Sequence, residues 1–221
     1  MDQQRTPIVI DIYSDVVCPW CYVGKRRLER ALSRVGTIST EVLWRPFQLN
    51  PTMPRVGMDR TAYLEAKFGS LDAFGRLEAQ VGAAGASERI AFAFDRIQKT
   101  PNTFLAHRLI WFAGQRGRQD AVVEALFKGY FEEGADIGDP SILAGIAASA
   151  GLDAGRFLES DQGVADVKAE EAAGHRLGIR AVPYFVLNHK YGLSGAQSVD
   201  VFLGAIENVR AGQAEAHLSR K

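Results

Sequence analysis

The pattern of apolar and polar positions predicts a β–α–β arrangement at the start of the chain. Residues 7–13, with the sequence PIVIDIY, form a short β-branched run that is apolar on both faces, which predicts a buried strand. A helical pattern begins at Pro19 and is predicted to end near Gly36. Residues 40–50 predict a second strand, and the turn-forming pair Asn50-Pro51 ends it.

The middle of the chain has a different pattern. From about residue 57 to residue 176, apolar positions recur with the 3.6-residue period of helices, and strand-like runs largely disappear. One of these helices is predicted to start at Thr100-Pro101, where a capping residue precedes proline. Residues 81–87, VGAAGAS, follow no predicted strand, so we interpret them as a flexible joint and not as a phosphate-binding loop.

The end of the chain returns to strand-like patterns. Residues 180–188 and 189–196 predict two strands joined as a hairpin, and a final amphipathic helix follows them. The two flanks together contain about 100 residues, which is enough for one small domain. We therefore predict an α/β protein in which residues 1–56 and 177–221 form one discontinuous domain and residues 57–176 form an all-helical insertion.

Composition disfavours several classes of function. The 221 residues include 26 basic and 26 acidic side chains, so the net charge favours neither nucleic acid nor an anionic membrane as a partner. The hydrophobic fraction of 47% supports a sizeable core, and no apolar run approaches the roughly 20 residues of a membrane span. The N-terminal MDQQRTPIVIDIYSD lacks the character of a secretory signal, so we expect a cytoplasmic protein.

The chain contains two cysteines, Cys18 and Cys21, which three kinds of site would use. A structural disulfide is disfavoured, because cytoplasmic thiols keep such pairs reduced. A structural zinc site needs four ligands, and the sequence offers neither a second cysteine pair nor two closely spaced histidines. The histidines are scattered at His107, His175, His189 and His217. We therefore expect no metal site and favour a redox-active pair.

The position of the cysteines fits thiol–disulfide chemistry. Cys18 lies between the predicted strand and the predicted helix, where unpaired backbone N–H groups and the helix dipole stabilise a thiolate. Cys21 lies one turn further along, where it can resolve a mixed disulfide formed at Cys18. Pro19 occupies the first helical position, where its missing N–H costs nothing. A cis bond between Val182 and Pro183 would present the Val182 backbone to an incoming substrate.

Four blocks of the sequence resemble one known family. SDVVCPWCYVGKRRLERAL carries both cysteines, and GIRAVPYFVLNHKYGLSGAQ carries the candidate docking strand. With NTFLAHRLIWFA and LFKGYFEEGADIGD, these blocks resemble the DsbA family of thioredoxin-fold proteins, and within it the FrnE-like branch, over nearly the whole chain. The resemblance implies a thioredoxin fold interrupted by a helical domain and dithiol–disulfide exchange. It also implies Cys18 as the nucleophile, Cys21 as the resolving cysteine and Pro183 as a facing cis-proline.

Two alternative functions stay open. Kappa-class glutathione transferases and 2-hydroxychromene-2-carboxylate isomerases resemble this chain in layout, but they typically carry serine at the position of Cys18. Retention of both cysteines therefore favours redox chemistry over a glutathione-dependent transferase or isomerase. The other alternative is a thioredoxin-like chaperone or binding module. The expected partners are protein or small-molecule thiols and disulfides. Glutathione is a candidate co-substrate, no tightly bound cofactor is expected, and a homodimer is left open.

Further residues are candidates for the site. Asp11 is either a buried carboxylate that relays protons to Cys21 or a solvent-facing residue at the strand end. His107 and Asn102 either border the cysteine site or belong to the core. Trp20 is a candidate substrate-binding residue, in the core or in the wall of a substrate cleft. It cannot supply the positive charge of a histidine between the cysteines, so we expect a weaker oxidant than a Cys-Pro-His-Cys protein.

A run of basic residues follows the cysteine pair. We expect Lys25, Arg26, Arg27 and Arg30 to form mainly a solvated face of the helix. The alternative is a contact between one of them and an anionic substrate such as glutathione.

Overall fold

The computed structural model describes residues 7–36 and 38–218. The chain begins with β1 (Ile8–Ser14), α1 (Pro19–Leu32) and β2 (Thr40–Pro46). Its middle contains β3 (Met58–Asp59), α2 (Arg60–Phe68), α3 (Leu71–Ser87), the short 3-10 helix η1 (Phe94–Arg96), β4 (Lys99–Thr100), α4 (Phe104–Gly114), α5 (Gln119–Phe131), α6 (Pro140–Ser149), α7 (Gly155–Glu159) and α8 (Val164–Arg176). It ends with β5 (Tyr184–Leu187), β6 (Tyr191–Ser194) and α9 (Val199–Leu218).

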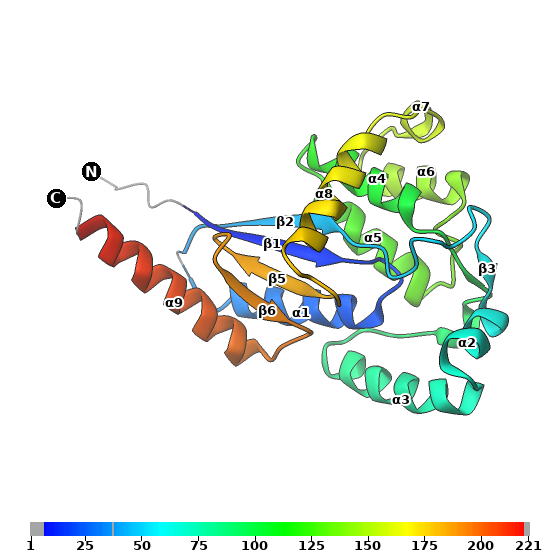
Figure 1. The fold of residues 1–221 in the computed structure, drawn as a ribbon, viewed down its shortest axis with the longest axis horizontal. Coiled ribbons are helices and arrows are strands. Elements are labelled where there is room, and N and C mark those ends of the chain that lie inside the picture. Colours follow the sequence, from blue (N-terminus) through cyan, green and yellow to red (C-terminus); the bar gives the residue numbers. More distant parts are fainter. Residues whose placement is uncertain (1–6, 37, 219–221) are drawn as a thin grey trace.

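The main sheet is built from both ends of the chain (Figure 1). Its strand order is β2-β1-β5-β6, so β1 pairs with parallel β2 on one side and with antiparallel β5 on the other. Strand β6 continues β5 as an antiparallel hairpin. The hairpin turn includes Asn188 and His189, which both have positive φ, a backbone region where asparagine and histidine are enriched. The hairpin predicted at this position is therefore confirmed.

The two faces of the sheet carry different side chains, because residues along a strand point alternately to opposite sides. Ile12 and its cross-strand partner Phe185 share the face covered by α1 and α9, where the Phe185 ring meets Phe202 edge-on with 4.7 Å between centroids. Tyr13 points to the other face, against α8. A Cβ atom on Gly174 of α8 would lie only 2.6 Å from the Tyr13 ring, so glycine lets this helix lie directly on the sheet.

The helices between β2 and β5 join the sheet through the aromatic side chains of α5. Phe127 stacks on Tyr22 of α1 with 5.0 Å between ring centroids and meets Trp44 of β2 edge-on at 6.2 Å. Phe131 meets Phe92 edge-on at 5.4 Å. One continuous hydrophobic core therefore extends from the sheet into the helices. The predicted α/β fold with a helical insertion is confirmed.

The middle segment also contains two short strands that its helical period did not predict. Strands β3 and β4 pair in an antiparallel manner, with Met58 opposite Thr100. Because Thr100 belongs to this ladder, the helix predicted to start at Thr100-Pro101 begins instead at Phe104. Asn102 supports this start, since its Oδ1 accepts a hydrogen bond of 2.9 Å from the Phe104 N–H. The domain limits at 56/57 and 176/177 stay a prediction.

The prediction of a flexible joint at residues 81–87 is wrong, because these residues form the C-terminal part of α3. Glycine lowers helix propensity by about 1 kcal/mol per residue, which is why the sequence pattern indicated a break. A Cβ atom on Gly85 would collide with the ring of Phe92. Close packing of that ring against the helix therefore explains a glycine here and offsets its low propensity.

Candidate active site

The two cysteines lie at the N-terminal end of α1. Cys18 is the N-cap residue, with φ −93° and ψ 110°, and Pro19 opens the helix. The Cys18 N–H donates to Asp15 O at 3.0 Å, and the Cys21 N–H donates to Cys18 O, also at 3.0 Å. This end of a helix favours negative charge, because its first N–H groups have no partners within the helix and its dipole is positive there.

The thiols of Cys18 and Cys21 are both free and both buried, with Cys21 the deeper of the two. Burial raises the pKa of the Cys21 thiol well above its usual range, and the neighbouring Cys18 raises it further. Interactions with the Ser14 side chain and the Asp15 backbone act in the opposite direction. Cys21 is therefore a neutral thiol at neutral pH and must lose a proton before it can act as a nucleophile.

The entrance of β5 faces Cys18. The Val182–Pro183 peptide bond is cis, and the Cys18 thiol donates to Val182 O with a sulfur–oxygen distance of 3.6 Å. Pro183 packs on α1 at Gly24, where a Cβ atom would lie 3.1 Å from Pro183 Cγ. The fold therefore brings Cys18, Cys21, Val182 and Pro183 together, although Cys18 and Val182 are 164 positions apart in the sequence.

Asp11 lies on the other side of the sheet. Its carboxylate accepts a hydrogen bond of 2.7 Å from Arg45 Nε and lies 3.2 Å from His189 Nδ1. Arg45 in turn pairs with Glu170 of α8 at 3.3 Å, which places the Asp11 carboxylate on the face that α8 covers. Cys21 belongs to α1 on the opposite face. Contrary to the relay hypothesis, the structure does not bring Asp11 to the cysteine pair.

The other predicted site residues have different surroundings. His107 of α4 is 3% exposed, and its Nε2 lies 3.4 Å from Asp15 Oδ1, three residues before Cys18. Asn102 attaches α4 to the loop after β2, because its Nδ2 donates to Met53 O at 2.6 Å. Trp20 is half-buried and packs against the main core. Of these three residues, His107 reaches the loop that leads to the cysteines.

The basic residues of α1 form an interface with other helices. Lys25 is buried and pairs with Glu124 of α5 at 3.0 Å. Arg27 and Arg30 both pair with the buried Glu88, which directly follows α3, at 3.0 and 2.7 Å. Arg26 pairs with Glu124 as well. The prediction of a solvated face is therefore wrong for the buried Lys25 and the partly buried Arg26 and Arg27, whereas Arg30 is exposed as predicted.

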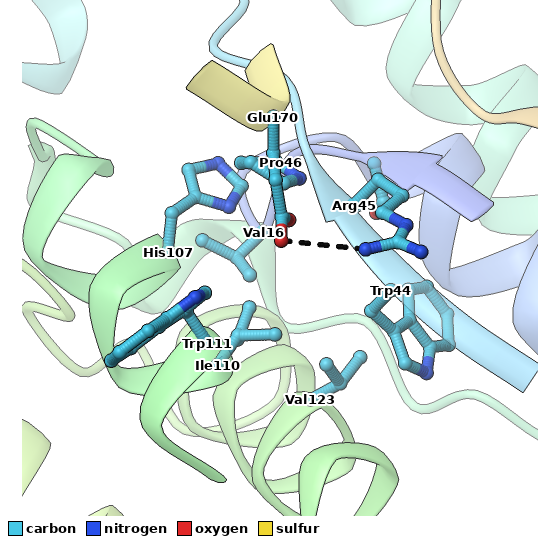
Figure 2. A pocket seen from close by; sticks show the side chains of 10 residues that line it. Val16, Trp44, Arg45, Pro46, His107, Ile110, Trp111, Val123 and Glu170 are labelled. Atoms are coloured by element: carbon cyan, nitrogen blue, oxygen red, sulfur yellow. Dashed lines mark hydrogen bonds and ion pairs between the residues drawn. The ribbon is translucent and has the colours of Figure 1, made fainter. Parts of the chain in front are cut away.

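A small cavity lies behind the cysteine loop, between the ends of β1 and β2 and helices α4, α5 and α8 (Figure 2). Its polar lining comes from Ser14, Arg45, His107 and Glu170, and Figure 2 shows Glu170 paired with Arg45. Its apolar lining comes from Val16, Trp44, Pro46, Ile110, Trp111 and Val123. Sequence reasoning missed Ser14, which lines this cavity, and Asp15, which faces His107. They lie four and three residues before Cys18, and an acid in an otherwise apolar loop was a visible signal.

Neither a metal centre nor a membrane-spanning helix is found in the described part of the chain. Its histidines, cysteines and carboxylates form no group of three or more arranged to hold a metal ion. Within the same residues, no helix has both the length and the apolar composition needed to cross a bilayer.

Three solved structures resemble this chain over most of its length. A crystal structure described as a probable DsbA oxidoreductase from Streptomyces coelicolor has a TM-score of 0.83 and 35% identity, covering 92% of this chain and 90% of that one. A 2-hydroxychromene-2-carboxylate isomerase has a TM-score of 0.71 and 15% identity, with 94% and 98% coverage. The cytosolic disulfide reductase DsbM from Pseudomonas aeruginosa, in a structure with GSH, has a TM-score of 0.64 and 18% identity, with 92% and 99% coverage. At such low identity, the last two likenesses show the fold alone.

The family model gives the most direct assignment. It describes a DSBA-like thioredoxin domain and matches residues 9–207, which contain the main sheet, the helical insertion and both cysteines. The resemblance seen in the sequence blocks is thus confirmed at the level of the family, while the FrnE-like branch stays a prediction. The chain belongs to the DSBA-like thioredoxin domain family.

Proposed function

We propose that this protein is a dithiol–disulfide oxidoreductase that acts through Cys18 and Cys21 on protein or small-molecule disulfides. One observation carries the proposal: Cys18 occupies the N-cap of α1, with Cys21 one turn later and the Val182 carbonyl against its sulfur. A helix N-terminus is where proteins place reactive cysteines, because it stabilises the thiolate. Membership of a family whose Streptomyces relative is described as an oxidoreductase supports the same chemistry.

The proposed reaction consists of two thiol–disulfide exchanges. The Cys18 thiolate attacks one sulfur of the substrate disulfide, so that a mixed disulfide forms and the other substrate sulfur leaves as a thiolate. Cys21 then loses its proton and attacks the Cys18 sulfur. The Cys18–Cys21 disulfide forms, and the second substrate sulfur leaves. The substrate gains two electrons, the cysteine pair loses two, and the reverse sequence oxidises a dithiol.

Val182 and Pro183 are proposed to dock the substrate. In the reduced protein, the Cys18 thiol donates to Val182 O, and the cysteine sulfur therefore lies against the backbone at the entrance of β5. An extended peptide or a glutathione molecule that binds along this backbone would bring its sulfur to Cys18. Trp20 lies within the same turn of α1 as Cys18 and Cys21 and is proposed to contact the bound substrate.

Reduction or isomerisation of disulfides is the direction that we propose, in the cytoplasm. The glutathione pool of that compartment keeps dithiols reduced, so two glutathione molecules can return the Cys18–Cys21 disulfide to the dithiol and leave as glutathione disulfide. The structural relative DsbM is described as a cytosolic disulfide reductase and was determined with GSH, which supports this direction and a role for glutathione.

Reduction of insulin by dithiothreitol tests the proposal. The wild-type protein is expected to accelerate insulin precipitation, Cys18→Ala to abolish the acceleration, and Cys21→Ala to accumulate a mixed disulfide at Cys18. Full activity in a variant that lacks both cysteines would contradict the proposal. Equilibration with glutathione buffers then gives the reduction potential, and a value close to the cytosolic poise is expected for a reductase or an isomerase.

A glutathione-dependent transferase or isomerase is the second candidate, favoured by the fold likeness to 2-hydroxychromene-2-carboxylate isomerase. Conversion of chlorodinitrobenzene with glutathione separates it from the first. Turnover that Cys21→Ala leaves unchanged, together with no insulin reduction by the wild type, would favour the transferase or isomerase.

A further inference from the structure

A groove of about 390 Å³ lies in the helical insertion. It is formed by α2, α3 and residues 94–98, a segment that includes η1 and leads to β4. Figure 1 shows α2 and α3 at the outer edge of the molecule, on the far side of the insertion from α6 and α7. Pockets that bind ligands typically enclose roughly 300–1,000 Å³, so this groove is large enough to bind one.

Apolar side chains give the groove two accessible aromatic rings. Leu64 of α2 and Ile97 are buried in its lining, whereas Phe74 of α3 and Phe94 of η1 are half-buried. The Phe94 ring stacks on Phe92 with 4.8 Å between ring centroids, which holds it in position. The groove can therefore contact an apolar part of a ligand through a ring whose position is already fixed.

The Glu78 and Asp95 carboxylates of the groove form no hydrogen bond or ion pair within the part of the chain that the structure describes. Burial raises the pKa of the Glu78 carboxyl, the nearby Arg60 lowers it, and Asp95 raises it again. Burial and the neighbouring acid thus disfavour the charged form of Glu78. A cation bound beside both carboxylates would stabilise that form.

The charges of the lining favour a cationic ligand. Three carboxylates, those of Asp59, Glu78 and Asp95, accompany one cationic side chain, that of Arg60. Asp59 is the N-cap residue of α2, and its Oδ1 already accepts a hydrogen bond of 2.9 Å from the Ala62 N–H. Glu78 and Asp95 are therefore the carboxylates that a ligand can use, and together they outweigh the charge of Arg60.

We propose that this groove binds an arginine side chain on a segment of a protein partner. The guanidinium pairs with Glu78 and Asp95, and the aliphatic stem lies on the Phe94 ring, because arginine buries its stem on apolar surfaces while its charged end stays polar. The Phe74 ring is already covered by Arg60. This inference goes beyond the proposed thiol chemistry and does not depend on it.

Arginine suits the groove better than lysine does. A guanidinium group is planar, donates two parallel hydrogen bonds to a carboxylate and stacks on aromatic rings, whereas an ammonium group is a compact, strongly hydrated charge. Arg60 shows that a guanidinium fits here. Its charged group lies 5.5 Å from the centroid of the Phe74 ring, and its Nη1 donates to Tyr130 Oη at 3.4 Å.

The exposed part of the lining suits a protein segment better than a free small cation. Thr61, Asp95 and Gln98 are exposed, so the groove is open to a second chain. The Thr61 hydroxyl and the Gln98 carboxamide can hydrogen-bond to a peptide backbone on either side of the arginine. A free cation would leave both groups unused.

The groove also lies close to the helix that carries the cysteines. Phe94 stacks on Phe92, and the Phe92 ring meets Tyr22 of α1 edge-on with 6.1 Å between centroids. Tyr22 directly follows Cys21 in the sequence. A partner whose arginine occupies the groove is therefore held near the start of α1.

An NMR titration of the full-length, ¹⁵N-labelled protein tests the proposal. The probe is a blocked pentapeptide with arginine at its centre and glycine elsewhere, and its matched control carries citrulline, which has nearly the same shape without the charge. The protein variants are Glu78→Gln and Asp95→Asn. Glu65→Gln is the control variant, because Glu65 is an exposed acid of α2 outside the groove. Glutathione and agmatine are titrated separately, as an anion and as a free small cation.

The arginine peptide is expected to shift the amide signals of residues 59–61 and 94–98 in a saturable manner, and the citrulline peptide is not. Loss of the charge at Glu78 should raise the Kd about 10-fold, and loss of the charge at the exposed Asp95 about 3-fold. Glu65→Gln should keep the wild-type Kd. Asp95→Asn changes an exposed side chain and keeps the test available if Glu78→Gln does not fold.

Several results would overturn the proposal. They are equal binding of the arginine and citrulline peptides, an unchanged Kd in both Glu78→Gln and Asp95→Asn, and signal shifts confined to another part of the molecule. Agmatine that binds more tightly than the peptide would indicate a site for small cations, and glutathione bound at residues 59–61 would indicate an anion site at Arg60. Either result would contradict the assignment to a protein segment.

The titration is independent of the proposed function of the cysteine pair. The Cys18→Ala variant should bind the arginine peptide as tightly as the wild type does. If insulin reduction fails and the peptide binds, the groove assignment stands without the redox function. If insulin reduction succeeds and the peptide does not bind, the redox function stands and the groove assignment fails.

Discussion

The two ends of α1 use polar groups in opposite ways. At its start, Cys18 and Cys21 are free thiols, and unpaired polar atoms lie next to them. Further along, Lys25, Arg27 and Arg30 each pair with acidic groups of other elements. One helix thus carries a reactive end, which we define as residues 18–21, and an anchored end, which we define as residues 25–30.

The two ends differ in whether their polar groups have partners. The proposed exchange reaction needs groups that are free to change partners, and unpaired buried polar groups of this kind cost stability. The anchored end has its charges matched and holds the helix against α3 and α5. Substitutions at the anchored end should therefore change unfolding free energy and leave thiol exchange intact, whereas substitutions at the reactive end should do the reverse.

The largest effect on stability is expected from Lys25→Met. It leaves the half-buried Glu124 without one of its cationic partners, and breaking a buried ion pair costs about 3–5 kcal/mol. Because Glu29 and Asp120, the other partners, are partly exposed and can be rehydrated, we expect a loss of about 2–4 kcal/mol in urea unfolding. The exposed Lys128→Met is the matched control, with a loss below about 1 kcal/mol. Equal losses in both variants would mean that the buried ion pairs of the anchored end contribute no more to stability than an exposed pair.

Alkaline pH should weaken the packing of two buried tyrosines, Tyr130 of α5 and Tyr22 of α1, of which Tyr22 contacts the anchored end through Arg26. Burial raises the pKa of Tyr130 from 10.0 to about 12, and burial followed by the hydrogen bond to Glu132 raises that of Tyr22. The folded state therefore favours the neutral phenols. This stability is complete below pH 10 and is lost as pH rises through the folded-state pKa, by about 2–3 kcal/mol for Tyr130. Urea midpoints across this range measure the loss, which should be smaller in Tyr22→Phe, and a flat profile would contradict it.

Gly24→Ala tests the contact between the two ends and the β5 entrance. The added Cβ would lie 3.1 Å from Pro183 Cγ and 3.2 Å from Phe185 Cζ, so overpacking should cost about 1–3 kcal/mol. Displacement of Pro183 should also change the surroundings of Cys18. We therefore expect slower attack of Cys18 on 5,5′-dithiobis(2-nitrobenzoate), which is measured as the release of the first thionitrobenzoate. Gly204→Ala in α9, where nothing lies within 4 Å, is the control and should stabilise the helix by about 0.5–1 kcal/mol. Wild-type kinetics in Gly24→Ala would show that the position of Pro183 does not affect the exchange reaction.

Arg30→Ala should have the smallest effect. The Arg30 side chain is 49% exposed, and Arg27 remains paired with Glu88 at 3.0 Å. An exposed ion pair is worth about 0–1 kcal/mol, so the unfolding midpoint should shift only slightly. A shift as large as that of Lys25→Met would mean that the exposure of a basic side chain does not predict how much its ion pair contributes to stability.

Sequence reasoning located the reactive end because its signals are local. A strand, two cysteines one helical turn apart and a proline at the first helical position are adjacent in the chain. Pro183 was predicted from its place at the entrance of a strand, and the family resemblance supported it. It misjudged the anchored end because the acidic partners on other elements, Glu88 and Asp120, lie 58 or more positions away from the basic residues they pair with. A basic run that includes one acid, Glu29, predicts a solvated face as long as these distant acids are not known to be close.

The same limit explains two other outcomes. Thr100-Pro101 has the local chemistry of a helix start, but pairing of Thr100 with Met58 in β4 and β3 prevails over it. Asp15 is completely buried and lies 3.4 Å from His107 of a distant helix, and the loop sequence predicts neither property. The strand pattern also does not show that Asp11 faces α8 and not α1, because which helix covers which side of the sheet is a tertiary property.

The sheet made from both chain ends also determines when the site comes into existence on the ribosome. Cys18 leaves the exit tunnel early, whereas Val182 follows 164 residues later. Central strand β1 has no antiparallel neighbour until β5 has been translated, and contacts of such long range form slowly. A nascent chain that stalls before β5 would expose two thiols without the backbone that faces them. The proposed exchange reaction therefore requires that translation has passed β5.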